Sequence, residues 1–267
     1  MAFQELKDRQ SFVWGNAPFE EVATGLADVH DAIVAAVGPA EGKQWLEVAC
    51  GTGELAQRAA RTGAEVTGVD FAPVLVETAK RQAAEAGLDI DFRVGDAENL
   101  EFPDASFDVV TSTFGAMFAP DQPATAAELA RVTKPGGRLA LANWTPDGGV
   151  GVMFRLFAQF QPPPPEGAGA PLDWGRPEHV KQLLGDAFDL QIEERVSPYD
   201  APSAEEYWAT FSPSFGPLKT LLENSDEAKQ EEVHRAFVDG FTAQFGLPDG
   251  SIRHTREYLL VTGTRKS

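Results

Sequence analysis

Short apolar runs alternate with segments of helical periodicity over the first half of the chain. Five runs have the length of buried strands and end at glycine or polar residues, and they cover 44–49, 65–70, 90–94, 107–113 and 138–144. In other segments apolar residues recur at three- and four-residue spacing, which predicts helices over 20–37, 54–62, 73–87 and 121–133. Strands that alternate with helices in this way are typical of a doubly wound parallel sheet with helices on both faces.

This regular alternation stops after the fifth strand. Residues 145–175 contain GGVG, PPPP and GAGAPLDWG, which predict a loop-rich excursion around one short helix. A helix over 177–184 and strands over 188–196 and 257–265 then resume the sheet, while 203–245 is expected to be helical in several pieces. The simplest organisation is one α/β domain that carries helical insertions over one edge of the sheet.

Charge and composition narrow the class of protein. The 267 residues are 43% hydrophobic and 24% charged, which is ordinary for a globular chain. The 41 acidic and 22 basic residues leave a net charge of −19, which repels a nucleic-acid backbone and an anionic membrane. The N-terminus lacks a basic region followed by an apolar one, and no apolar run reaches the length of a membrane span. We therefore expect a cytoplasmic protein that binds neither nucleic acid nor membrane.

Cysteine and histidine content argues against disulfides and metals. Cys50 is the single cysteine, so an intrachain disulfide is impossible, and a lone cysteine fits a reducing compartment. The four histidines are scattered and none has the spacing of a metal-binding motif, so no metal site is expected.

A glycine turn between the first strand and the next helix carries the clearest chemical signal. Gly51 and Gly53 flank Thr52, and such a turn lets the backbone approach a ligand and brings helix N–H groups beside the ligand's polar end. Asp70 ends the second strand, where an acid can accept hydrogen bonds from ribose hydroxyls. Because open α/β sheets bind ligands at the carboxyl ends of their strands, the pattern predicts a ligand that contains a nucleoside.

Two cofactor classes compete for this turn. The dinucleotide fingerprint GxGxxG needs a third glycine, which the segment from Ala49 to Glu54 lacks. Glu47 and Glu54 also bracket the turn and would repel the two charges of a pyrophosphate. S-adenosylmethionine has a sulfonium, an ammonium and a ribose but no phosphate, so it suits the turn better. A nicotinamide-dependent oxidoreductase stays open as the alternative enzyme.

The segment WLEVACGTG (45–53) resembles motif I of the class I S-adenosylmethionine-dependent methyltransferases. In that family an acid precedes the glycine turn, and here the matching acid is Glu47. Ala49 stands where the family usually has glycine, a departure that slightly crowds the turn. The resemblance implies that the methionyl end of the cofactor lies against Ala49, Cys50, Gly51, Thr52 and Gly53.

Later motifs extend the resemblance in the same order and spacing. Asp70 matches the acid that binds both ribose hydroxyls, and Phe71 and Leu75 match positions beside the adenine. The remaining matches place Asp96 and Ala97 at the adenine edge, and Thr113 and Phe114 under the methionyl part. ELARVTKPGGRLALANW (128–144) is similar to the segment that leads into the family's fifth strand.

The resemblance implies an α/β, Rossmann-like, doubly wound sheet of seven strands, mixed in direction, with helical cap insertions. The first five strands would be parallel, and a terminal hairpin would insert one antiparallel strand. The single domain, 1–267, would have its core in about 40–145, 177–200 and 252–267, and its cap in 1–35, 145–176 and 203–250.

The methyl acceptor is less clearly encoded. Acceptor pockets are mostly apolar, so we expect the acceptor to contact Trp14, Phe118, Trp144 and Phe154. Most aromatic residues of 207–245 are expected in the core, with a few in the pocket wall. The candidate general bases His30, His179, Tyr207 and His254 are each expected at the surface or satisfied in the core. No base is required, because a sulfonium is an activated leaving group and alignment in a dry pocket can supply much of the rate.

The hypothesis is therefore an S-adenosylmethionine-dependent methyltransferase that acts on a small molecule by SN2 displacement. The alternative from another class is a protein that binds S-adenosylmethionine or S-adenosylhomocysteine without turnover. The catalytic residues, the acceptor atom and the oligomeric state are left open by the sequence.

Overall fold

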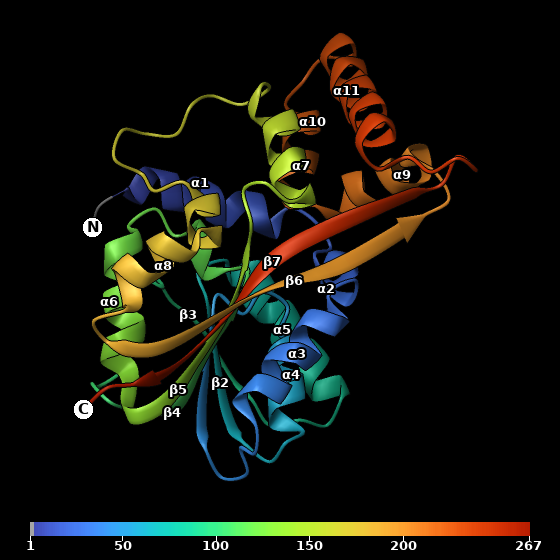
Figure 1. The fold of residues 1–267 in the computed structure, drawn as a ribbon. Helices are drawn as coiled ribbons and strands as arrows, with labels where there is room; N and C mark the ends of the chain where they lie inside the picture. The colour runs from blue at the N-terminus through green and yellow to red at the C-terminus, as the bar shows by residue number, and fades with distance from the viewer. Residues whose placement is uncertain (1–2) are drawn as a thin grey trace.

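A seven-stranded sheet forms the centre of the molecule in the computed structural model, which describes residues 3–267 (Figure 1). The strand order is β3-β2-β1-β4-β5-β7-β6, with β1 to β5 parallel and β7 antiparallel to both of its neighbours. The expected seven-stranded mixed sheet is thereby confirmed. The strands are β1 (Gln44–Val48), β2 (Glu65–Asp70), β3 (Asp91–Val94), β4 (Phe107–Thr113), β5 (Thr133–Trp144), β6 (Phe188–Ala201) and β7 (Ile252–Arg265).

Helices cover both faces of the sheet. One face carries α3 (Ala27–Val37), α4 (Glu54–Ala60) and α5 (Pro73–Glu85), and the other carries α6 (Gln122–Val132) and α8 (Pro177–Leu184) (Figure 1). Local sequence sets where these helices begin. Pro73 occupies the first position of α5, where no N–H is needed, and the carboxylate of Asp121 accepts the N–H of Ala124 at the start of α6, 3.0 Å away.

The cap lies beyond the end of the sheet, where β6 and β7 project past the other strands (Figure 1). Its pieces contact one another and β7, and they also meet the rest of the domain where α1 contacts α5 and η2 contacts β5. They are α1 (Gln4–Gly15), α2 (Glu20–Thr24), α7 (Gly149–Ala158), α9 (Ala204–Ser214), α10 (Gly216–Glu223), α11 (Glu227–Phe245) and the short helices η1 (Ala116–Phe118) and η2 (Pro171–Gly175). No helix within residues 3–267 is both long and apolar enough to cross a bilayer.

The prediction of one helix over 20–37 is wrong in one respect, because the structure has two helices there, α2 and α3. The break falls at Gly25, whose carbonyl accepts a hydrogen bond from Nη2 of Arg256 at 2.7 Å. Val29 and His30 both donate their N–H groups to Leu26 instead. A side chain from β7 thus replaces a helical hydrogen bond, and nothing in the local periodicity indicates it.

The two terminal strands, β6 and β7, are longer than the strands that the sequence predicts over 188–196 and 257–265. β6 and β7 pair continuously from Phe188 opposite Arg265 to Ala201 opposite Ile252. Polar residues continue both strands beyond the sheet, because the antiparallel ladder satisfies their backbone groups whatever the side chains are. This projecting ribbon carries one wall of the cap.

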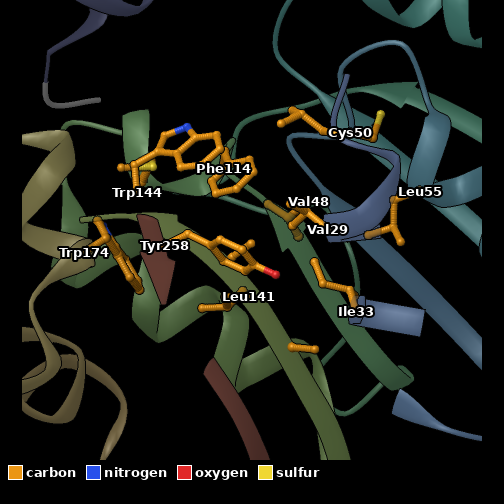
Figure 2. Close-up of a cluster of buried hydrophobic side chains, with 14 of the residues drawn as sticks. Val29, Ile33, Val48, Cys50, Leu55, Phe114, Leu141, Trp144, Trp174 and Tyr258 are labelled. Atoms are coloured by element: carbon orange, nitrogen blue, oxygen red, sulfur yellow. The ribbon is translucent and has the colours of Figure 1, made fainter. Parts of the chain in front are cut away.

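The apolar core extends over both faces of the sheet and into the cap, and part of it lies between the sheet and the first group of helices. Figure 2 shows side chains from α3, α4, β1 and β5 packed there, among them Ile33, Leu55, Val48 and Leu141, all fully buried or nearly so. Aromatic residues from the carboxyl ends of β4 and β5 lie at the edge of this cluster, next to the cap.

Candidate active site

A cavity of about 270 Å³ lies at the carboxyl ends of β1, β2, β4 and β5, between the sheet and the cap. Thirteen of the residues expected at the site line it. The cofactor-side positions among them are Glu47, Ala49, Cys50, Gly51, Asp70, Phe71, Leu75, Thr113 and Phe114. The positions expected to contact an acceptor are Trp14, Phe118, Trp144 and Phe154. Strand ends far apart in the sequence therefore meet at one hollow.

Four expected site residues, Thr52, Gly53, Asp96 and Ala97, lie outside the lining of this cavity. The Thr52 hydroxyl donates to the carboxylate of Glu54, with an oxygen–oxygen distance of 2.8 Å. Gly53 has a φ of 85°, and a Cβ there would lie 2.8 Å from the ring of Phe92. Gly53 thus shapes the turn and allows close packing, and its predicted contact with a cofactor stays a prediction.

Ala49 adopts the left-handed conformation, with a φ of 54°. This region disfavours residues that have a Cβ, which explains why glycine is usual here in the family that the motif resembles. Gly115 accommodates the extra methyl group, because a Cβ on it would lie 2.5 Å from both the Cβ and the carbonyl oxygen of Ala49. The turn is therefore crowded, as the sequence predicts, and a glycine after β4 provides the space.

Asp70 is buried at the end of β2 and holds the glycine turn in place. One carboxylate oxygen accepts the N–H of Gly51 and the other accepts the N–H of Ala72, each at 2.9 Å. Burial raises the pKa of Asp70 to about 6, against the opposing effect of these two hydrogen bonds. Each oxygen keeps a further lone pair for a donor in the cavity.

Glu47 is a buried acid with an unused oxygen. Its side chain is almost fully buried on β1, and Oε2 has no hydrogen-bond partner. Burial, followed by the nearby Glu54, raises the pKa of Glu47 well above its ordinary value. The Oγ1 of Thr113 and the Nδ1 of His30 are likewise buried without partners. Three orphan polar atoms on residues that line one cavity indicate a polar ligand.

Cys50 contributes space rather than reactivity. It is buried, and a Cβ on Gly68 of β2 would lie 3.1 Å from its sulfur. Burial, Asp70 and Glu47 together raise the pKa of the Cys50 thiol well above its ordinary value. The residue is therefore held as a neutral thiol at the turn, which is unsuited to nucleophilic catalysis.

Asp96 is engaged by the cap helix α1. Its Oδ2 accepts from Nζ of Lys7 at 2.6 Å, and its Oδ1 accepts the N–H of Glu98 at 2.9 Å. Lys7 also pairs with Glu98 at 2.6 Å. Burial opposes the charge of Lys7, but these bonds outweigh it and raise the pKa of the ammonium. The acid that the resemblance places at the adenine edge thus also attaches α1 to the sheet.

Aromatic rings form the cap side of the cavity. Trp14 contacts the rings of Phe19, Phe118 and Phe215 with centroid distances of 4.9–5.7 Å. Phe114 and Trp144 stack with nearly parallel rings, as Figure 2 shows. From α9, the lining includes Tyr207 and Phe211, whereas the aromatic residues of α11 are absent from it and pack in the core of the cap. The cavity thus has an acidic end and an aromatic end.

Three of the four candidate bases line the cavity. His30, Tyr207 and His254 do so, whereas His179 lies elsewhere and bonds to Gln122 at 2.7 Å. Burial lowers the pKa of His30 and of His254 to about 4, so both are neutral at physiological pH. The Tyr207 hydroxyl lies 3.3 Å from Nδ1 of His254, and burial raises the pKa of this hydroxyl.

Arg256 is the site residue that the sequence analysis missed. It lies on β7 and lines the cavity beside His254. A period-two signal was available, because Ile252, His254, Tyr258 and Arg256 occupy alternate positions and all are buried. An arginine on the buried face of a strand is unusual and indicates a specific partner.

Comparison with known proteins gives this geometry a context. The profile of a family described as a methyltransferase domain matches residues 46–141. An uncharacterized protein of Mycobacterium tuberculosis (strain ATCC 25618 / H37Rv) is 34% identical over 253 residues, which are 92% of this chain and 89% of that protein. Demethylmenaquinone methyltransferase of Thermus thermophilus is 42% identical over 123 residues, which are 44% of this chain and 55% of that enzyme.

A solved structure shares the fold. Geranyl diphosphate C-methyltransferase from Streptomyces coelicolor A3(2), in complex with Mg²⁺, geranyl diphosphate and S-adenosyl-L-homocysteine, aligns with a TM-score of 0.56 and 17% identity over 90% of this chain and 80% of that one. The strand order, the glycine turn and the sequence matches all point to the same family. The chain belongs to the class I S-adenosylmethionine-dependent methyltransferase family.

Proposed function

We propose that the protein transfers a methyl group from S-adenosylmethionine to a small molecule bound at the aromatic end of the cavity. The observation that carries the cofactor assignment is the pair of buried acids, Glu47 and Asp70, on adjacent strands at one cavity. Glu54 also lines this end. Such a wall suits a cationic ligand and would repel the pyrophosphate of a nicotinamide cofactor.

The residues present fit this cofactor. The unpartnered Oε2 of Glu47 is a free acceptor for an ammonium group, and the remaining lone pairs of Asp70 can accept from ribose hydroxyls. The Oγ1 of Thr113 offers a further unused polar atom below the turn. Asp96 and Ala97 would contact the adenine edge, as the family resemblance implies, and Asp96 would do so while it is bonded to Lys7.

The cap residues would orient the acceptor and exclude water. When bound, the cofactor supplies a methyl group on a positively charged sulfur, which is an activated leaving group. Trp14, Phe118, Trp144 and Phe154 surround the aromatic end and limit the approach of solvent. Burial lowers the pKa of His30 and of His254 to about 4, which makes both rings weak bases, so alignment of the acceptor with the methyl group would supply the rate.

A small molecule is the favoured acceptor for two reasons. The net charge of −19 repels nucleic acids. The relative from Thermus thermophilus is named for demethylmenaquinone, a small molecule, which supports an acceptor of this size class.

Calorimetric titration with S-adenosylmethionine, S-adenosylhomocysteine and NAD tests the cofactor assignment. We expect both sulfur compounds to bind and NAD to give no heat. Asp70→Asn should weaken the binding of S-adenosylmethionine at least tenfold, whereas Asp239→Asn, at an exposed position whose side chain forms no hydrogen bond or ion pair within residues 3–267, should leave it unchanged. Binding of NAD in place of S-adenosylmethionine would overturn the assignment in favour of an oxidoreductase.

Methyl transfer itself needs a second experiment. The protein is incubated with methyl-labelled S-adenosylmethionine and a metabolite extract, and the products are separated to find a labelled compound. We expect label in a low-molecular-weight fraction. Intact cofactor binding without any labelled product would overturn catalysis and support a protein that binds the cofactor without turnover.

A further inference from the structure

Arg256 places a buried positive charge at the aromatic end of the cavity. Its side chain projects from β7, is 7% exposed, and lines the cavity. Its Nε donates to the carbonyl of Ser197, and its Nη2 donates to the carbonyl of Gly25 and to the hydroxyl of Ser197, at 2.7–2.8 Å. Three of the five N–H groups are thus used in joining α2, β6 and β7.

The other two N–H groups, both on Nη1, have no acceptor among residues 3–267. All acceptors of Arg256 are neutral oxygens, and none of the ion pairs in the described chain includes this residue. Asp28 reaches the guanidinium only through the Ser197 hydroxyl, which donates to Asp28 at 3.0 Å. A buried guanidinium without a direct anion is unfavourable unless a partner binds it.

Glu21 lines the same cavity but does not neutralise this charge. Its carboxylate accepts a hydrogen bond from Ser214 at 2.6 Å, and it forms no ion pair with Arg256. The guanidinium instead lies over the ring of Tyr199, 5.5 Å from the ring centroid. The charge is therefore screened by aromatic and neutral groups and is left available to a ligand.

The surroundings of Arg256 are suited to an apolar ligand. Tyr207, Phe211 and Phe215 of the cap line the cavity together with Met153 of α7. Phe211 and Phe215 are stacked with ring centroids 4.8 Å apart. Rings on the walls and a single cation at one end form a pocket that matches a flat apolar body carrying a negative group.

We infer that the methyl acceptor is an apolar small molecule with an anionic oxygen group, a carboxylate or a phenolate, which pairs with Nη1 of Arg256. The inference rests on the proposed function, because it assigns the ligand of the acceptor half of that cavity. Arg256 acts in recognition and orientation. The apolar body lies against the cap aromatics and extends toward the acidic, cofactor-binding end.

The test compares two probes of equal shape, 2-naphthoate and 2-naphthamide, in calorimetric titrations of the protein saturated with S-adenosylhomocysteine. We expect wild-type protein to bind the carboxylate at least tenfold more tightly than the amide, because only the carboxylate neutralises the buried guanidinium. Arg256→Met should reduce this preference to less than threefold. Equal affinity of the two probes for wild-type protein, or no binding of 2-naphthoate at millimolar concentration, would overturn the inference.

Ser197→Ala is the matched control for the structural contacts of Arg256. It removes one hydrogen bond of the guanidinium but keeps the charge and Nη1, so the preference for 2-naphthoate should persist. If Arg256→Met does not fold, a crystal structure of wild-type protein with both ligands decides the matter. A naphthoate carboxylate within hydrogen-bond distance of Nη1 supports the inference, and a carboxylate bound elsewhere refutes it. Because S-adenosylhomocysteine binding is measured first, failure of the cofactor assignment is recognised separately.

Discussion

Replacing Glu47 by glutamine should stabilise the ligand-free protein at neutral pH while weakening its cofactor binding. The Glu47 side chain is 2% exposed, its Oε2 has no partner, and burial, with Glu54 and Asp70 nearby, opposes its ionisation. Its pKa in the folded protein is therefore well above the ordinary 4.5. Glutamine has nearly the same shape and carries no charge, so Glu47→Gln removes this electrostatic penalty.

The size of the effect follows from proton linkage. A raised pKa means that the contribution of Glu47 to stability is fully present below pH 4.5 and is lost as the pH rises through the folded-state pKa. As the pH rises from 4.5 to the folded-state pKa, the unfolding equilibrium constant of the wild type increases relative to that of the variant by up to about tenfold per pH unit. Between pH 5 and pH 7 the unfolding equilibrium should therefore move in favour of the variant's folded state.

Urea denaturation of both ligand-free proteins at pH 5, 6 and 7 measures this difference. Titrating groups far from Glu47 are common to both proteins and cancel in the comparison, whereas the coupling of Glu47 to Glu54 and Asp70 is part of the difference that is measured. Glu101→Gln, at an exposed position, is the control and should follow the wild type at every pH. Parallel pH profiles for the wild type and Glu47→Gln would refute the reasoning. Calorimetry on the same variant should show at least tenfold weaker binding of S-adenosylmethionine, because an amide cannot neutralise an ammonium group.

Three other changes have expected outcomes. Because the pKa of Asp70 is about 6 and ribose hydroxyls need its ionised form, cofactor affinity should fall about tenfold per pH unit below pH 6 in calorimetry, and a flat profile would contradict this. Gly115→Ala should lower the free energy of unfolding by about 1–3 kcal/mol in urea, because the new methyl group would meet both the Cβ and the carbonyl oxygen of Ala49, and an unchanged urea midpoint would argue against this close contact. Lys7→Met should lower the unfolding free energy by about 1–3 kcal/mol, because it leaves the buried Glu98 carboxylate without its cation; an unchanged urea midpoint would argue against the Lys7 contact.

Much of the fold could be predicted from the local pattern of apolar and polar residues. Buried parallel strands are short apolar runs and helices have their own periodicity, so the order of elements from 44 to 144 follows from local pattern, while the mixed direction of the sheet follows from the family resemblance. The break between α2 and α3 could not be predicted from this pattern. It depends on a hydrogen bond from Arg256 to Gly25, and local periodicity carries no signal from a donor that distant in the chain.

The same division applies to the site. The sequence by itself determined the acidic end, because Glu47, Asp70 and the glycine turn lie at strand ends, and parallel strands bring their carboxyl ends to one edge. Only the tertiary structure decided the aromatic end, where the long hairpin carries Arg256 and His254 against α9 and α2. The physical reason is that parallel strands, held together by backbone hydrogen bonds, can be recognised in the sequence as apolar runs, and their ends then lie at one edge. Contacts in the cap depend on side chains packing between segments that are distant in the chain, and no local sequence pattern indicates which segments will meet.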